Sequence, residues 1–221
     1  MDYDKAMSKK PYQHKKPVKP HMFFRTLLKV LSAPALMGSD FSFTQDGMEK
    51  LGKDEPCLYL MNHSGFLDMK IATTILYPRP INIITTSDAF VGMEWLMRQI
   101  GCIPTKKFVT DLTLVKDMIY TLKTLKSSVL MYPEASYSFD GTATPLPESI
   151  GKCLKLLQVP VVVVRTYGAF HRDPLYNNLQ LRKVEVSAKM EYLLSPEEIK
   201  EKKPSEINAI LKDRFTFDNF L

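Results

Sequence analysis

The stretch CLYLMNHSGFLDMKIATTILYPRPINIITT, residues 57–86, contains a strand, a helix and a second strand in succession. Residues 57–62 are a short apolar run of the kind found in buried strands, and residues 81–86 are rich in β-branched side chains. Between them, residues 66–77 have the spacing of a helix, which Pro78 ends. This order predicts two parallel strands joined by a crossover helix.

The same alternation continues along the chain. Further strands are expected at 128–132 and 159–168, and further helices at 92–100, 111–126 and 149–158. Strands that are apolar along their whole length and alternate with helices are typical of a sheet that is covered on both faces. We therefore predict an α/β fold: one domain with a mainly parallel central sheet and helices on both faces.

Three segments lie outside this alternation. Residues 34–56 are punctuated by proline and glycine, which predicts a connecting region. Residues 182–193 alternate polar and apolar side chains, which predicts a half-exposed strand at the edge of the sheet. Residues 196–220 are expected to form a helix, with Ser195 as its N-cap and Pro196 at its first position.

Length and composition exclude several classes of protein. The chain has 221 residues, of which 45% are hydrophobic and 24% charged, as in a globular domain and not in a disordered or collagen-like chain. Residues 22–36 contain two charges and are shorter than the roughly 18–20 residues of a membrane span. No signal peptide is expected, because the start is polar and lysine-rich. The three widely spaced cysteines predict reduced, buried thiols of a cytosolic protein and neither disulfides nor a zinc site.

The positive charge of the chain resides at its beginning. Residues 1–30 carry eight basic and two acidic side chains, so the whole net charge of +6 lies there and the remainder is neutral. We divide the chain into a basic arm at 1–21 that is disordered in isolation, an amphipathic interfacial helix at 22–36 and an α/β domain at 37–221. A neutral body without a nucleic-acid-binding motif disfavours nucleic acid as a partner.

The helix at 22–36 has two interpretations. Phe23, Phe24, Leu27, Leu28 and Leu31 fall on one stripe at about 100° per residue. Beside a lysine-rich arm, such a helix suits the surface of an anionic membrane. Alternatively, the helix packs its apolar stripe on the domain and the lysines are solvated. The two arrangements are compatible.

The motif NHSGFLD places His63 and Asp68 at a strand-to-helix junction. In an open α/β sheet, ligands bind beyond the carboxyl ends of the strands, where His63 is expected. An aspartate in the first turns of the helix can reach back to one imidazole nitrogen and leave the other as a general base. The alternative is a capping histidine beside an aspartate that is stabilised by the helix dipole.

Two further motifs follow expected strands. MYPEASYS, residues 131–138, puts Glu134 directly after a strand and a proline, where it lines the rim with His63 or caps a turn. GCIPTKK, residues 101–107, puts two lysines on a loop after a short strand. Lysine pairs are usually solvated, so this motif alone indicates little about function.

Together these blocks resemble the glycerolipid acyltransferase family, whose best-known members are the 1-acylglycerol-3-phosphate acyltransferases. The family pattern runs Asn-His-x-x-x-x-Asp, a Gly-x-Ile block that ends in Arg, Phe-Pro-Glu-Gly-Thr-Arg-Ser, and an apolar Val-Pro-Val block. Here the blocks occur in that order at 62–68, 101–107, 132–138 and 159–164. The resemblance covers about residues 57–168, and four blocks in order are far more specific than any one of them.

The resemblance implies the transfer of a fatty acyl group from acyl-CoA or acyl-carrier protein to a glycerolipid hydroxyl in phospholipid synthesis, with lysophosphatidic acid as the expected acceptor. It implies no metal or cofactor, and a cytoplasmic enzyme at the inner face of the membrane. The general base would be His63, oriented by Asp68. The substrate-binding residues would be Glu134, Ser136, Lys106 and Lys107.

The sequence departs from the family pattern at three places. Gly-Thr-Arg is replaced by Ala135-Ser136-Tyr137, so an arginine associated with the acceptor phosphate is missing. Lys107 stands where arginine is usual, which keeps the charge but loses the bidentate geometry. Gly65 stands where a serine is usual.

These departures leave the expected base in place and alter the expected phosphate site. Lys106, Lys107 and Arg165 are candidates to replace the missing arginine. Alternatively, the acceptor is not a simple lysophosphatidic acid. The alternative function is a non-catalytic lipid-binding module at the membrane surface with the same fold.

Overall fold

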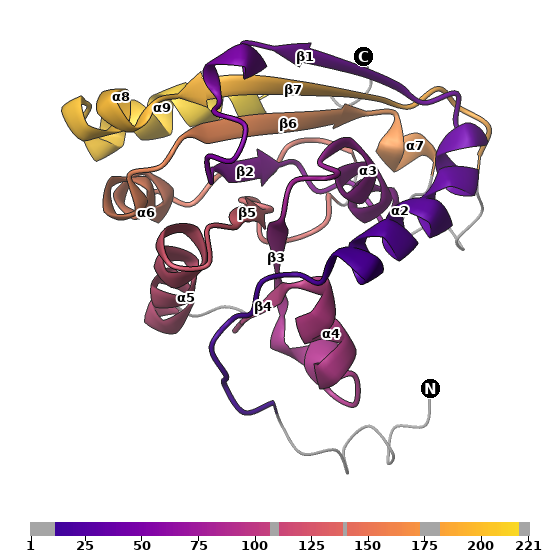
Figure 1. Ribbon diagram of the computed structural model, residues 1–221. Helices are drawn as coiled ribbons and strands as arrows, with labels where there is room; N and C mark the ends of the chain where they lie inside the picture. Colours follow the sequence, from indigo (N-terminus) through magenta and orange to yellow (C-terminus); the bar gives the residue numbers. More distant parts are fainter. Residues whose placement is uncertain (1–11, 107–110, 139–140, 173–181, 217–221) are drawn as a thin grey trace.

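The computed structural model describes residues 12–106, 111–138, 141–172 and 182–216 (Figure 1). Within these residues, one sheet contains seven strands in the order β1-β7-β6-β2-β5-β3-β4. The strands are β1 (Ser42–Asp46), β2 (Leu58–Met61), β3 (Ile81–Thr86), β4 (Cys102–Thr105), β5 (Ser128–Met131), β6 (Val161–Tyr167) and β7 (Ser187–Leu194). The predicted α/β fold is confirmed.

The central strands run in one direction. β2 pairs in parallel with both β5 and β6, and β3 pairs in parallel with β4 and β5. Leu58 is in register with Val129 of β5 and Val161 of β6, so these strands also end at the same edge of the sheet. β7 is antiparallel to β6, and β1 is parallel to β7.

Helices cover both faces of the sheet. They are α2 (Met22–Met37), α3 (Leu67–Ile75), α4 (Glu94–Ile100), α5 (Leu112–Lys123), α6 (Ser149–Leu157), α7 (Ala169–Arg172), α8 (Pro196–Glu201) and α9 (Pro204–Phe215), with short 3₁₀ turns at Met48–Lys50 and Ser87–Phe90. Figure 1 shows α2 and α3 on one side of the sheet and α5, α6, α8 and α9 on the other. Among the described residues, no helix combines the length and apolar character needed to span a bilayer.

Alternation along the central strands builds a core on each face. Tyr59 and Met61 of β2 point to the face that α3 covers, and Leu58 and Leu60 point to the face that α5, α6 and α9 cover. All four side chains are fully buried. A strand that is buried on both faces has to be apolar throughout, which is why its sequence shows no alternation.

Two predictions about the ends of the domain are wrong. β7 is not the edge strand, because β1 lies outside it and forms part of the predicted connecting region 34–56. β1 has the sequence SFTQD and is mostly exposed, so it carries no apolar pattern. The predicted helix 196–220 is two helices, since α8 ends at Glu201 and Pro204, which has no N–H, begins α9. Residues 217–220 lie outside the described residues.

The cysteines form no disulfide in the described residues. Cys57 and Cys102 are buried as predicted, and Cys153 is only partly buried. Burial raises the pKa of Cys57 to about 11 and that of Cys102 to about 12, so both remain thiols at neutral pH.

The described part of the basic arm, residues 12–21, lies extended against the body. His14 Nε2 is 2.8 Å from Asp117 Oδ2, and Asn82 Nδ2 donates to the carbonyl of Val18 at 2.8 Å. The disorder expected for the isolated arm stays a prediction, and residues 1–11 lie outside the described part of the chain.

Helix α2 turns its polar side towards the protein. Arg25 and Ser32 are buried, and the Ser32 hydroxyl lies 3.3 Å from the hydroxyl of Thr73 on α3. Phe23 and Leu31 of the predicted apolar stripe are more than 60% exposed. Leu27 is also exposed, whereas Phe24 and Leu28 are half-buried. Only part of the stripe therefore packs on the domain.

Candidate active site at the carboxyl ends of the central strands

His63 lies in the turn between β2 and α3. Asp68, in the first turn of α3, accepts hydrogen bonds on Oδ2 from the backbone N–H groups of Ser64 at 2.6 Å and Gly65 at 2.9 Å. These donors have no partner within the helix, and a carboxylate at a helix N-terminus is favoured by the helix dipole. The aspartate therefore shapes the turn that carries the histidine.

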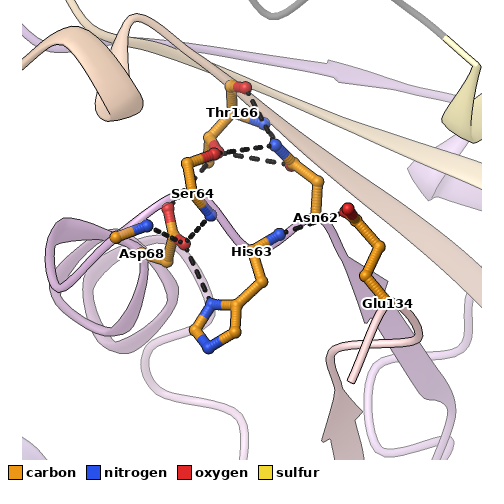
Figure 2. Close-up of polar contacts among 7 residues, drawn as sticks. Asn62, His63, Ser64, Asp68, Glu134 and Thr166 are labelled. Atoms are coloured by element: carbon orange, nitrogen blue, oxygen red, sulfur yellow. Dashed lines mark hydrogen bonds and ion pairs between the residues drawn. The ribbon is translucent and has the colours of Figure 1, made fainter. Parts of the chain in front are cut away.

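The structure brings His63 and Asp68 together. His63 Nδ1 lies 3.1 Å from Asp68 Oδ2 (Figure 2). The aspartate side chain is fully buried and the histidine side chain is 16% exposed. Figure 2 shows the second ring nitrogen, Nε2, directed away from Asp68, and no described residue hydrogen-bonds it. This geometry leaves Nε2 able to accept a proton while the carboxylate stabilises the imidazolium.

A buried amide fixes the end of β2 to the neighbouring strand β6. Asn62 Oδ1 accepts from the backbone N–H of Thr166 at 2.8 Å, and Asn62 Nδ2 donates to the carbonyl of Thr166 at 3.2 Å. The hydroxyl of Thr166 lies 3.5 Å from Asp68 Oδ1. Thr166 thus joins the site from a strand far away in the sequence, and no local motif indicates it.

Glu134 lies beside His63, but its carboxylate faces backbone groups. Oε1 accepts from the backbone N–H of His63 at 3.3 Å, and Oε2 accepts from that of Thr144 at 2.8 Å. Burial raises the pKa of Glu134, and these two hydrogen bonds oppose the shift. The Ser136 hydroxyl lies 3.5 Å from the carbonyl of Glu134. In this arrangement Glu134 fixes the loop after β5 to the turn that carries His63.

Two tyrosines stack on the imidazole of His63. The ring centroids of Tyr132 and Tyr137 each lie 3.9 Å from that of His63, at interplanar angles of 20° and 29°. Burial raises the pKa of both phenols, and the charge of Asp68 adds to the effect. We did not expect either contact from the sequence, where Tyr137 is simply the residue that replaces an arginine.

The structure does not bring Lys106 to the histidine. Lys106 follows β4, which is three strand positions from β2, or about 14 Å at the usual spacing of strands. Its side chain is exposed, and its backbone N–H donates to Asp111 Oδ2 at 3.2 Å. Lys107 lies outside the described residues.

Arg165 is paired with a carboxylate. Its Nη2 lies 3.4 Å from Glu191 Oε2, and Arg214 of α9 binds the other oxygen of the same carboxylate at 3.1 Å. Arg165 therefore faces α9, on the side of the sheet opposite α3. This position does not suit a replacement for the missing arginine beside His63.

Two proteins of known activity resemble this chain. A chloroplastic 1-acyl-sn-glycerol-3-phosphate acyltransferase of Brassica napus, BAT2, is 29% identical over 127 residues, which are 55% of this chain and 36% of the relative. The chain thus spans little more than a third of that relative. The crystal structure of the lysophosphatidic acid acyltransferase PlsC from Thermotoga maritima superposes with a TM-score of 0.69 at 16% identity, over 87% of this chain and 77% of that chain.

The match to PlsC shows the fold alone. The match to a family extends further: the sequence model of the Acyltransferase family fits residues 42–166, more than half of the chain. That range runs from the start of β1 to Thr166 and includes His63, Asp68 and Glu134. The chain therefore belongs to the Acyltransferase family.

Proposed function

We propose that this protein transfers a fatty acyl group from an acyl thioester to the free hydroxyl of lysophosphatidic acid. The observation that carries the proposal is the imidazole of His63, which is bonded on one side to a buried carboxylate and has its other nitrogen free at the carboxyl ends of the strands. Family membership and the activity named for the Brassica relative support this reaction. We infer acyl-CoA or acyl-carrier protein as the donor, as the resemblance implies.

The proposed reaction needs one base and no covalent acyl-enzyme. His63 Nε2 takes the proton of the acceptor hydroxyl as its oxygen attacks the thioester carbonyl. This attack forms the new C–O bond of a tetrahedral intermediate. Collapse of the intermediate re-forms the carbonyl and breaks the C–S bond, and the protonated His63 returns the proton to the departing thiolate. Ser64 is not a suitable nucleophile, because it is buried and its hydroxyl accepts from Asn62 Nδ2 at 3.2 Å.

The exposed apolar surface of α2 supports a position at a membrane. Six large apolar side chains of this helix are exposed: Met22, Phe23, Leu27, Val30, Leu31 and Met37. The neighbouring α4 exposes Trp95 by 66%, and the ring of Phe24 meets that of Trp95 edge to face at 5.5 Å. We propose that α2 and α4 enter the interface of an anionic membrane and that the lysines of the arm add attraction.

The second candidate function is a lipid-binding module without catalysis. The replacement of the family's Gly-Thr-Arg by Ala135-Ser136-Tyr137 favours it, since that arginine is associated with the acceptor phosphate. The intact contact between His63 and Asp68 favours the enzyme, because binding alone does not require a base.

Thiol release separates the two candidates. The purified chain is given lysophosphatidic acid on phosphatidylglycerol vesicles, with acyl-CoA or acyl-carrier protein as donor. We expect turnover, and a decrease of at least about 100-fold in His63→Ala, as is usual for loss of a general base. His14→Ala is the matched control, since His14 also pairs with an aspartate but lies on the arm. Vesicle binding without thiol release from either donor would favour the binding module.

Fluorescence tests the membrane contact independently of turnover. Trp95 is the only tryptophan of the chain, so its emission reports on α4 alone. Transfer of an exposed indole into the interface is expected to shift its emission to shorter wavelength when anionic vesicles are added. Unchanged emission at vesicle concentrations that bind the protein would exclude α4 from the contact.

A further inference from the structure

Four residues of the segment that follows β5, residues 132–138, contact His63. Tyr132 and Tyr137 lie against its ring, and the Glu134 carboxylate accepts from its backbone N–H at 3.3 Å. The backbone N–H of Ser138 donates to the carbonyl of His63 at 2.8 Å. One short segment therefore holds both the backbone and the side chain of the proposed base.

The two tyrosines occupy opposite faces of the imidazole. Both centroids lie 3.9 Å from that of His63 with small interplanar angles, and two rings at that distance cannot share one face. Asp68 occupies the Nδ1 edge. The 16% of the His63 side chain that remains exposed is thus at the other edge of the ring, where Nε2 lies.

The hydrogen bond to Asp68 alone does not fix the plane of the ring. With Nδ1 held near Asp68, combined rotations about the Cα–Cβ and Cβ–Cγ bonds can still tilt the imidazole and swing Nε2 away from an incoming hydroxyl. A stacked aromatic contact contributes about 0.5–1.5 kcal/mol beyond the area that it buries, and here there is one on each face. Contacts on both faces oppose tilting in both directions, which matters because proton transfer requires a base at hydrogen-bond distance and in line.

The backbone after β5 is bent so that Tyr137 returns over His63. Ala135 has φ +57°, in the left-handed region, and its N–H donates to the carbonyl of Tyr132 at 3.1 Å. This conformation costs a residue with a Cβ about 1–2 kcal/mol. The ring of Phe66, at the start of α3, supports Tyr137 edge to face at 5.8 Å. Such strain persists where the surrounding contacts determine the conformation.

We propose that Tyr132 and Tyr137 are positioning residues that clamp the imidazole of His63 in one plane, so that the acceptor hydroxyl reaches Nε2 only along that plane. This inference rests on the proposed function for its consequence in catalysis. In this proposal the aromatic rings position the imidazole, and the tyrosine hydroxyls take no part. In the described residues the Tyr132 hydroxyl has no hydrogen-bond partner, which agrees with this assignment.

Kinetics of paired variants test the clamp. Tyr137→Phe keeps the ring, and Tyr137→Ala removes it from a side chain that is only half-buried. We expect kcat to fall at least tenfold in Tyr137→Ala, with KM for the acceptor changed less than threefold. Tyr137→Phe and Tyr132→Phe should stay within twofold of the parent. Tyr120→Ala, on α5, is the control for the loss of a tyrosine elsewhere.

Nuclear magnetic resonance tests the same contacts without turnover. The Cε1–H resonance of His63, assigned by its loss in His63→Gln, is expected at high field because rings lie on both faces. Tyr137→Ala should move it towards the unstacked position, and Tyr137→Phe should not. If Tyr137→Ala does not fold, Tyr137→Leu, which fills the space without a ring, replaces it in both experiments.

Several results would overturn the clamp. One is a His63 resonance that does not move in the variant without a ring. Others are a change in KM while kcat is unaffected, or a rise in kcat when the ring is removed. The last is a pair of phenylalanine variants that are as inactive as the alanine variant. The last result would instead assign chemistry to the hydroxyls. If the parent protein transfers no acyl group, the proposed function fails, and the resonance still decides whether the ring is clamped.

Discussion

Replacement of Asp68 by asparagine removes the negative charge of the carboxylate and keeps the shape of the side chain. Oδ2 of Asp68 accepts from two backbone N–H groups and faces His63 Nδ1, and Oδ1 faces the hydroxyl of Thr166. The amide oxygen of asparagine can take the first position. Its amide nitrogen then faces the Thr166 hydroxyl, which can accept. Asp68→Asn therefore fits the turn and removes only the negative charge.

The expected loss follows from the charge of the imidazolium. A carboxylate about 4 Å from a positive charge stabilises it by about 4 kcal/mol at an effective dielectric constant of about 20. Asp68 is fully buried, so solvent does not screen it as it would a surface pair. Since each 1.4 kcal/mol is a factor of ten in rate, kcat is expected to fall by about 10³ with little change in KM.

The assay is thiol release from the acyl donor, with thermal unfolding followed in parallel. Asp117→Asn is a matched control, because Asp117 is also a buried aspartate at 2.8 Å from a histidine but lies on α5, across the sheet from α3. Its activity should be unchanged. A folded Asp68→Asn protein that keeps more than a tenth of the parental kcat would refute the reasoning that this carboxylate stabilises a protonated His63.

Two further predictions concern stability. Because burial raises the pKa of Glu134, the folded state binds its proton more tightly than the unfolded state, and the contribution of this group to stability falls as pH rises from about 4.3 through the folded pKa. Urea unfolding should therefore show a smaller advantage of the parent over Glu134→Gln at pH 8 than at pH 5, and an equal advantage would contradict this. Gly151→Ala should cost about 1–3 kcal/mol, because its Cβ would meet the backbone oxygen of Pro204 and come within 2.6 Å of Asn208 Oδ1. Gly52→Ala, whose Cβ meets only the flexible side chain of Glu55, is the control for unfolding.

The sequence predicts the centre of the fold better than its margins. Strands such as β2 and β6 are buried on both faces, and their sequences therefore contain uninterrupted apolar runs. β1 joins the sheet through backbone pairing with β7 while its side chains remain mostly exposed, so its sequence does not need an apolar pattern. Without β1, the alternating β7 is naturally interpreted as the edge.

The same distinction holds for the site. His63 and Asp68 are five residues apart, so one turn and one helix start suffice to predict their contact. Thr166 reaches that pair only through the pairing of β6 with β2. The positions of the tyrosines depend on the bend at Ala135, which has a left-handed backbone conformation. Glycine, which favours this conformation, is usual here in the family, but alanine gives no such indication.

Helix α2 shows what periodicity leaves undetermined. The spacing of its apolar residues predicts a stripe, but not whether that stripe faces the domain or the surroundings. Full burial of a side chain such as Phe23 or Leu31 is worth about 1.5–3 kcal/mol, so a helix surrounded only by water gains by turning its stripe inward. Here most of the stripe faces outward and Arg25 is buried, with its pKa lowered to about 10 by desolvation. A bilayer on the outer face would cover the stripe, so the orientation of α2 supports the proposed position at a membrane.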